Sequence, residues 1–156
     1  GAKAALDFAP ATTDPGCTDS DAWVVAAASG LVTRAGRGVV VVDLDGDGLE
    51  QTGWNILYLH VSDLRVSSGD WVEISDLLGH PSCEGGVATG THVHIARKYN
   101  GEWIAADGPL SFVLSGWQAH AGGESYLGTL TRNDQTIPAS IYGTHESRIV
   151  RSRDDP

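Results

Sequence analysis

The sequence of 156 residues contains no methionine and begins at Gly1. A chain without methionine does not begin at a translational start, so we expect that a signal segment, a pro-segment or another part of a longer precursor precedes it. No apolar run approaches the roughly 20 residues that a membrane-spanning helix needs. The sequence therefore predicts no membrane span.

Basic residues are scarce. The chain has 10 Lys and Arg against 20 Asp and Glu, which gives a formal net charge of -10. The few basic side chains are scattered along the sequence, whereas binding to phosphate backbones requires clustered cations. Nucleic acid is therefore excluded as an expected partner. The oligomeric state cannot be read from the sequence.

Cysteine is almost absent, with Cys17 and Cys83 as the two examples. Two cysteines are too few to form a closed structural zinc site by themselves. In an acidic, processed chain a single pair favours a disulfide formed in an oxidising compartment. We therefore predict a bridge and an extracellular or cell-envelope location. The alternative is two separate buried thiols in a cytosolic protein.

Glycine is abundant, with 20 residues, and the hydrophobic and charged fractions are 41% and 19%. Such a composition is globular, and frequent glycines favour tight turns and β structure over long helices. Single strands are predicted at 3–9, 39–42, 54–61, 126–132 and 137–142, and the segments 23–32 and 65–78 are each predicted to form two short strands. Asn100 and Gly101 predict a hairpin turn, and 110–114 could form one helical turn. The sequence predicts an all-β fold with antiparallel pairing.

The most informative stretch is 85–95, a glycine-rich turn followed by His92 and His94 among β-branched residues. Side chains alternate between faces along a strand, so both imidazoles point the same way. Neutral imidazole is a common zinc ligand, and the pattern suits a metal site. The alternative is one buried, hydrogen-bonded histidine beside one solvated histidine.

Two further acidic features are candidates for metal binding. Asp7 interrupts an apolar strand, where a carboxylate is costly unless it is paired, coordinates a metal or faces water at a sheet edge. Asp43, Asp45 and Asp47 resemble the first half of an EF-hand calcium loop. Trp54 occupies the twelfth position in place of the bidentate Glu, which excludes a true EF-hand. The remaining alternatives are a calcium-binding hairpin and a solvated turn.

Together, Asp7, His60, His92 and His94 follow an order that resembles the lysostaphin/LytM-type zinc peptidases, which are peptidoglycan endopeptidases. The resemblance rests on Ala-Leu-Asp-Phe at 5–8, Ala-Ser-Gly-Leu-Val at 28–32, Leu-Tyr-Leu-His at 57–60 and Ala-Thr-Gly-Thr-His-Val-His-Ile at 88–95. It covers residues 4–98, and its histidine block is specific to the family.

The resemblance implies an antiparallel β-sheet core of the lysostaphin-like (duplicated hybrid motif) type. It implies a peptidase domain at 1–122 and a C-terminal β extension at 123–156. Asp7 and His94 would be zinc ligands, while His60 and His92 would flank the attacking water as general base and as stabiliser of the charged intermediate. The implied activity is that of a secreted zinc endopeptidase that hydrolyses cross-links or stem peptides of bacterial peptidoglycan.

The sequence departs from the family at one zinc ligand. The family's first ligand is a histidine four residues before the aspartate, and Lys3 stands at that position. A catalytic zinc takes three protein ligands plus water, so the third ligand would come from further upstream or from His80. Otherwise the chain is a catalytically impaired relative that serves as a cell-wall-binding, regulatory or structural domain of an extracellular assembly.

Overall fold

The computed structural model describes residues 2–12 and 14–150, which divide into two compact units. One unit comprises Leu6–Ile104, and the other combines the described residues up to Ala5 with those from Ala105 onward. Strands and turns dominate both, with short 3-10 turns at Ala2–Ala4 (η1) and His145–Ser147 (η2). The predicted all-β, antiparallel class is confirmed. Within the described residues, no helix has the length and apolar character that a membrane crossing requires.

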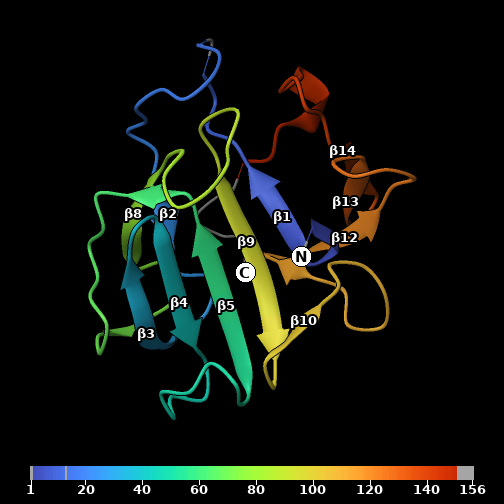
Figure 1. Cartoon of the computed structure of the whole chain (residues 1–156). Coiled ribbons are helices and arrows are strands. Elements are labelled where there is room, and N and C mark those ends of the chain that lie inside the picture. Colours follow the sequence, from blue (N-terminus) through green and yellow to red (C-terminus); the bar gives the residue numbers. More distant parts are fainter. Residues whose placement is uncertain (1, 13, 151–156) are drawn as a thin grey trace. The chain divides into compact units, whose positions relative to one another are not determined.

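The first unit is built on a large sheet in the order β1-β9-β5-β4-β3-β7, with β10 added to β9 (Figure 1). Its strands are β1 (Ala5–Phe8), β3 (Gly30–Gly36), β4 (Val39–Asp43), β5 (Trp54–Leu59), β7 (Trp71–Val72), β9 (Val93–Tyr99) and β10 (Glu102–Ile104). β9, drawn in yellow, runs between β5 and β1. This central position lets β9 present side chains beside both neighbouring strands.

The most deeply buried side chains of this sheet come from β4 and β5. The valine run at 39–42 forms β4, and Val40, Val41 and Val42 are almost completely buried. Four β-branched residues in succession favour a strand that is covered on both faces. Tyr58 of β5 is also buried, and its hydroxyl accepts a 2.8 Å hydrogen bond from the backbone N–H of Ala27. Burial raises the pKa of Tyr58 to about 12.

A small sheet of order β2-β8-β6 completes the first unit; its strands are β2 (Val24–Val25), β8 (Leu77–Pro81) and β6 (Val61–Ser62). β8 leads directly to Cys83, which forms a disulfide with Cys17. The predicted bridge is thereby confirmed. It joins the loop that precedes β2 to the loop that precedes β9, and so restrains the segment that leads into the His-x-His strand.

The local turn predictions are confirmed in one case and wrong in another. β9 and β10 form the predicted hairpin, with Tyr99 opposite Glu102. The segment 110–114 does not form a helical turn. The N–H of Phe112, whose side chain is buried, instead donates to the carbonyl of Ala106 at 2.7 Å, and Val113–Leu114 becomes strand β11. Pairing with the following strand outweighs local helix propensity there.

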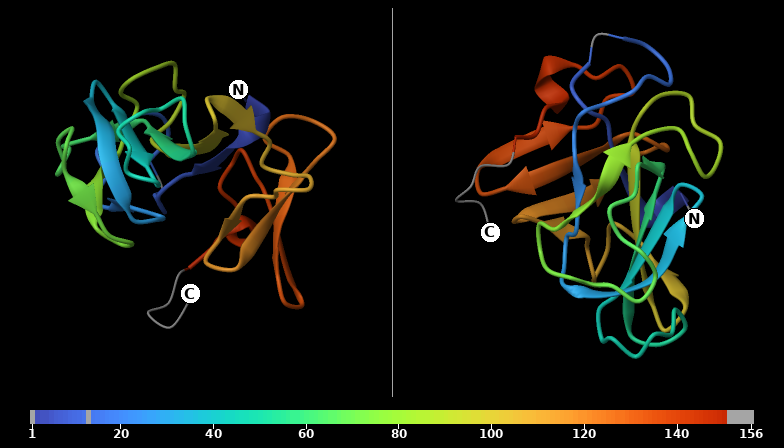
Figure 2. Two further views of the ribbon diagram at one scale, coloured as in Figure 1. Left: turned by 90° about the horizontal axis from the view of Figure 1, so that it is seen from below. Right: turned by 90° about the vertical axis from the view of Figure 1, so that its left-hand side faces the viewer.

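The second unit contains a four-stranded antiparallel sheet of its own, in the order β11-β12-β13-β14 (Figure 2). Its strands are β11 (Val113–Leu114), β12 (Trp117–Ala121), β13 (Gly128–Arg132) and β14 (Gln135–Pro138). The buried apolar residues of this unit, within the described part of the chain, include Phe112, Trp117 and Ala119. The compact units divide at Ile104, because β11 and β12 pair with the strands that follow them.

Candidate functional site

The sheet topology brings three segments that are distant in sequence to one place. Leu59, the last residue of β5, pairs with His94 of β9, so His60 follows directly beside the His-x-His segment. β1 lies on the other side of β9 and carries Asp7. The predicted site residues Asp7, His60, His92 and His94 therefore converge, all within the first unit.

The closest contact in this cluster joins Asp7 and His94. Oδ1 of Asp7 lies 2.8 Å from Nδ1 of His94 and 4.0 Å from Nε2 of His92. The three side chains are between 20% and 29% accessible, which leaves the cluster open to solvent. Thr91, Val93 and Ile95 are buried, as expected for the opposite face of an alternating strand. The face assignment drawn from the sequence agrees with this burial.

His60 occupies an unusual backbone conformation at the end of β5. Its φ is 65°, in the left-handed region that few non-glycine residues adopt, and its side chain is buried. This is why β5 ends at Leu59 and does not continue to 61 as the apolar pattern predicted. The turn places the His60 ring 4.5 Å from that of His92 and 6.4 Å from that of His94, between ring centroids.

Backbone carbonyls orient two of the imidazoles. Nδ1 of His60 lies 2.7 Å from the carbonyl of Glu84, and Nδ1 of His92 lies 2.7 Å from the carbonyl of Gly90. A carbonyl only accepts hydrogen bonds, so each Nδ1 carries the proton and donates it. In the neutral ring Nε2 is then left with a free lone pair, which can accept a proton or bind a metal.

The surroundings of His60 also favour its neutral form. Burial lowers the pKa of His60 below its ordinary value, and the nearby rings of His92 and His94 lower it further. The hydrogen bond to the carbonyl of Glu84 and the charge of Asp7 oppose this shift without cancelling it. His60 is therefore an unprotonated base over more of the neutral pH range than an exposed histidine.

The sequence predicts a loop before the His-x-His strand, but it does not predict that backbone carbonyls of this loop orient the imidazoles. A Cβ on Gly85 would lie 2.7 Å from the carbonyl oxygen of Arg37, and one on Gly38 would lie 2.5 Å from Glu84 backbone atoms. The two glycines therefore allow the loop before β9 to pack on the β3–β4 turn, where it holds Glu84 over His60. Paired glycines were a visible signal of close backbone approach, but the sequence does not say which segments meet.

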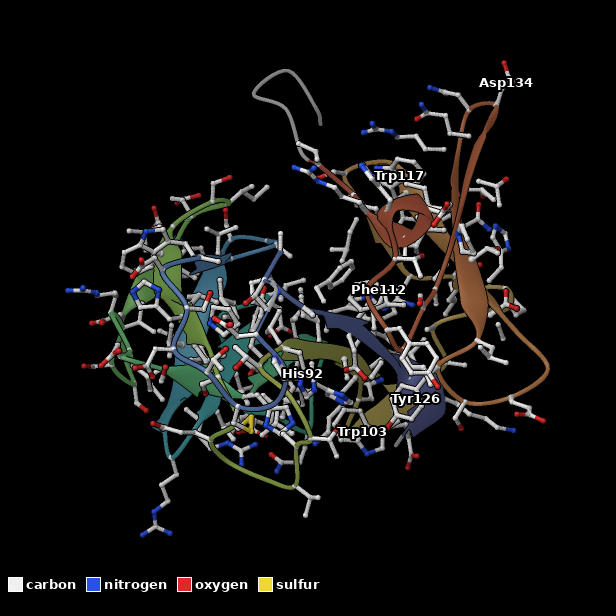
Figure 3. The ribbon with its side chains drawn as sticks, turned by 90° about the horizontal axis from the view of Figure 1, so that it is seen from above. His92, Trp103, Phe112, Trp117, Tyr126 and Asp134 are labelled. Carbon is white, nitrogen blue, oxygen red and sulfur yellow. A yellow bond between two sulfur atoms is a disulfide. The ribbon has the colours of Figure 1, made fainter. Side chains whose placement is uncertain are left out.

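Thr91 fixes the other side of this loop. Its hydroxyl accepts a 2.8 Å hydrogen bond from the N–H of Thr18 and donates one to the carbonyl of the same residue. The disulfide lies in the same region, because Ser82, next to Cys83, is bridged to His92 (Figure 3). The loop before β9 is therefore held by a covalent bond and by paired hydrogen bonds.

Comparison with known proteins agrees with this geometry. The family model described as peptidase family M23 matches residues 7–106, nearly the same range as the first compact unit. The chain belongs to peptidase family M23. The family is shown by a match over more than half of the chain, and Asp7, His60, His92 and His94 all lie inside the matched range.

Similar proteins carry related names. The chain is 28% identical over 139 residues to "Beta-lytic metalloendopeptidase" of Achromobacter lyticus, a match that covers 81% of this chain and 35% of that protein. It is 34% identical over 92 residues to "Protease LasA" of Pseudomonas aeruginosa, covering 54% of this chain and 21% of that protein. The chain thus spans about a fifth to a third of the length of these relatives.

A solved structure shares the fold. It is described as a novel M23 metalloprotease, pseudoalterin, from the deep sea, and it superposes with a TM-score of 0.69 at 26% identity. The match covers 87% of this chain and 79% of that one. The likeness therefore extends beyond the residues that the M23 family model matches.

The donor atoms at this site suit a zinc ion in part. M23 peptidases are zinc-dependent, and a carboxylate oxygen and an imidazole nitrogen are both zinc ligands. A carboxylate and an imidazole lone pair repel each other at 2.8 Å, so Asp7 and His94 require a cation or a proton between them. Among the described residues, no third His, Cys, Asp or Glu donor lies within 4.8 Å of both.

Neither Lys3, which stands at the position of the missing ligand, nor His80, the predicted substitute, completes the ligand set. Lys3 stands four residues before Asp7, and its ammonium group donates hydrogen bonds without a lone pair to offer a metal. His80 lies in β8, where its ring packs at 3.9 Å from that of Trp23 and Nδ1 lies 2.7 Å from the carbonyl of Ala22. The structure does not bring His80 to Asp7 and His94.

The three aspartates predicted as a calcium site do come together. Ligand atoms of Asp43, Asp45 and Asp47 lie within 4.8 Å of one another in the loop between β4 and β5. A hydrogen bond with the carboxyl of Asp43, together with the charges of Asp43 and Asp47, raises the pKa of Asp45. This arrangement concentrates negative charge in a small volume. It is separate from the histidine cluster, which lies at the other end of β5.

Proposed function

We propose that this domain is the catalytic part of a zinc-dependent endopeptidase that hydrolyses cross-links or stem peptides of bacterial peptidoglycan. The single observation that carries the proposal is the convergence of Asp7 and His94 to 2.8 Å, beside two histidines whose Nε2 atoms are free to accept a proton. Membership of the M23 family supports the same reaction class.

In this proposal Asp7 and His94 hold the metal through Oδ1 and Nδ1. Zinc at this position would polarise the scissile carbonyl and make water a better nucleophile at neutral pH. His92 and His60 would act through Nε2. The neutral ring of one would take a proton from the attacking water, and the other ring, protonated on Nε2 as an imidazolium, would donate a hydrogen bond to the developing negative charge. The carbonyls of Gly90 and Glu84 hold the Nδ1 proton of both rings, which leaves Nε2 as the atom that gains and loses a proton.

The depressed pKa of His60 favours its assignment as the base. A general base must be unprotonated at the working pH, and burial, which lowers the pKa of His60, favours that form. His92 is more accessible, and its Nε2 lies 4.0 Å from Asp7, close to the metal ligand pair. In the proposal His92 therefore holds the substrate oxygen, while His60 accepts the proton.

The disulfide supports an extracellular or cell-envelope location for this activity. Disulfides persist in oxidising compartments and are rare in the reducing cytosol, and Cys17 and Cys83 are bridged. Peptidoglycan lies in such a compartment. The net charge of -10 gives no electrostatic attraction to an anionic polymer, so substrate recognition is expected to depend on contacts within the site.

The test is hydrolysis of purified peptidoglycan by zinc-loaded protein. We expect new free amino groups to accumulate and mass spectrometry of the soluble products to locate the bond that is cut. The matched variants are Asp7→Asn, which removes a ligand charge, and Asp134→Asn, which makes the same change on an exposed turn of the second unit (Figure 3). Hydrolysis equal in both variants would contradict the proposal.

A second candidate function rests on Lys3, which stands where the resemblance places the first histidine ligand. In this case the domain binds peptidoglycan without cleaving it and serves as a regulatory or structural domain of an extracellular assembly. Co-sedimentation with insoluble peptidoglycan separates the two functions. Binding without release of amino groups, from protein that carries less than one zinc per chain, would favour the second.

A further inference from the structure

The loop between β4 and β5 has a feature that the histidine cluster does not explain. We call Asp43, Asp45 and Asp47 the acidic hairpin. Asp43 is fully buried, and its Oδ2 accepts a 2.8 Å hydrogen bond from the N–H of Gly48, whose φ is 82°. The chain therefore turns tightly around the Asp43 carboxylate. A cluster of carboxylates with a turn of this kind is common without any ion, so it does not establish a site by itself.

The independent observation is the side chain of Asn55, which is 1% exposed. Its amide nitrogen donates a 2.9 Å hydrogen bond to the carbonyl of Thr52, which fixes the orientation of the amide. Its Oδ1 accepts no hydrogen bond from any residue that the structure describes. A buried oxygen without a donor costs about 1–3 kcal/mol, so this atom calls for a partner that is not part of the described chain.

Asn55 faces the acidic hairpin. It is directly opposite Asp43 in the antiparallel pairing of β4 and β5. Opposite residues in such a pair point to the same face, with Cβ atoms about 4.5–5.5 Å apart. The carboxylate of Asp45 folds toward the same strand, because a Cβ on Gly53 would overlap it. The pairing thus puts the side chain of Asn55 on the same face of the sheet as that of Asp43, at the base of the loop.

We propose that Asp43, Asp45, Asp47 and Asn55 bind one calcium ion. Calcium takes six to eight oxygen ligands in flexible geometry, from carboxylates, side-chain amides, backbone carbonyls and water. The EF-hand pattern fails in this loop because Trp54 occupies the position of the final Glu, and Asn55 is the next residue along the chain. An EF-hand takes its last ligand from the helix that follows the loop. Here the buried amide oxygen of Asn55, in the strand that follows the loop, would supply that ligand.

The ion is expected to make the β4–β5 loop more ordered. Three carboxylates in contact repel one another, and a divalent cation removes that repulsion while it gives the oxygen of Asn55 a partner. Asn55 pairs with Lys98, whereas Leu59 pairs with His94, so the two metal positions are separated by about 13 Å along β5. Calcium is therefore expected to stabilise the domain without entering the hydrolytic reaction.

Calorimetric titration of chelator-treated protein with calcium chloride tests the proposal. We expect one calcium per chain with a Kd of about 1 mM or tighter, as for extracellular calcium modules, and an unfolding temperature that rises with calcium. Magnesium should bind more weakly, because it demands near-ideal octahedral geometry. The same titration after zinc loading should give the same calcium stoichiometry, which distinguishes this site from Asp7 and His94.

Two variants identify the ligands. Asp45→Asn should weaken calcium binding about tenfold or more, while Glu50→Gln should change it less than about twofold. Glu50 lies in the same loop and carries the same charge, but it pairs with Arg34 at 2.8 Å. Asn55→Leu removes the buried oxygen and should also weaken binding. Absence of calcium binding to the unaltered protein, or equal losses in Asp45→Asn and Glu50→Gln, would overturn the proposal.

Discussion

Nδ1 of His94 lies 2.8 Å from Oδ1 of Asp7, although 87 positions separate the two residues in the sequence. The contact exists because β1 and β9 are neighbours in the sheet, while β5 on the other side of β9 delivers His60. Four functional side chains therefore depend on the order of three strands. In the proposed reaction metal binding and proton transfer are carried by different atoms, so changes at single positions are expected to separate them.

Asp7→Ala is expected to abolish zinc binding at this site. Removal of the carboxylate leaves His94 as one ligand, and a single imidazole does not retain zinc against buffer. Elemental analysis at equilibrium with micromolar zinc gives the stoichiometry. His80→Asn is the control and should leave the zinc content unchanged, because the ring of His80 packs on Trp23. Zinc content unaltered by Asp7→Ala would refute the ligand assignment.

His60→Asn is expected to keep the metal and lose hydrolysis. Asparagine tolerates the left-handed backbone that His60 adopts with a φ of 65°, so the fold should persist. The loss of a general base or charge stabiliser typically lowers the rate by about 10²–10⁴-fold. Zinc content and peptidoglycan hydrolysis are measured on the same preparation. A variant that hydrolyses at the unaltered rate would show that His60 takes no part in the reaction.

Stability should fall on acidification because of His60. Its pKa is lower in the folded state than in an unfolded chain, so the unfolded state binds the proton more readily. The stabilising contribution is present above the ordinary histidine pKa and is lost as the pH falls through the folded value. We expect the unfolding temperature of zinc-free protein to drop further between about pH 8 and pH 5 than that of His60→Asn. Parallel curves for the two proteins would contradict this assignment.

The disulfide should contribute strongly to stability. It links residues 66 positions apart, and the chain-entropy model gives a contribution of about 4 kcal/mol for a loop of this length. We expect the Cys17→Ser, Cys83→Ser double variant to unfold about 8–16 °C lower. Reductant should lower the unfolding temperature of the unaltered protein and leave that of the double variant unchanged. A reductant effect of equal size on both would mean that another process is being measured.

The sequence was sufficient to predict side-chain patterns that repeat with a fixed period or pair with a fixed chemistry. The alternation of His92 and His94 against Val93, the Tyr99 hairpin and the Cys17–Cys83 bridge are of this kind. Each depends on residues whose chemistry or spacing leaves few alternatives. The all-β class follows from the same local signals.

What the sequence did not predict depends on backbone contacts and strand order. The hydrogen bond from His60 goes to the backbone carbonyl of Glu84 and does not involve the Glu84 side chain. The residue type at position 84 therefore gives no indication of this contact. The unit boundary at Ile104 follows from the pairing of β12 with β13, which is a property of the whole sheet. The buried oxygen of Asn55 is likewise visible only once the pairing of β4 and β5 is known.

β5 is six residues long, and a side chain must be held in place near each of its ends. Asn55 lies opposite Asp43 of the acidic hairpin, and His60 follows directly after Leu59. Because strand side chains have a period of two, a slip of one residue against β4 or β9 would turn every inward side chain outward. It would also withdraw His60 from His92 and Asn55 from Asp43 in one step. An insertion or deletion within this strand is therefore far less tolerable than substitutions along it.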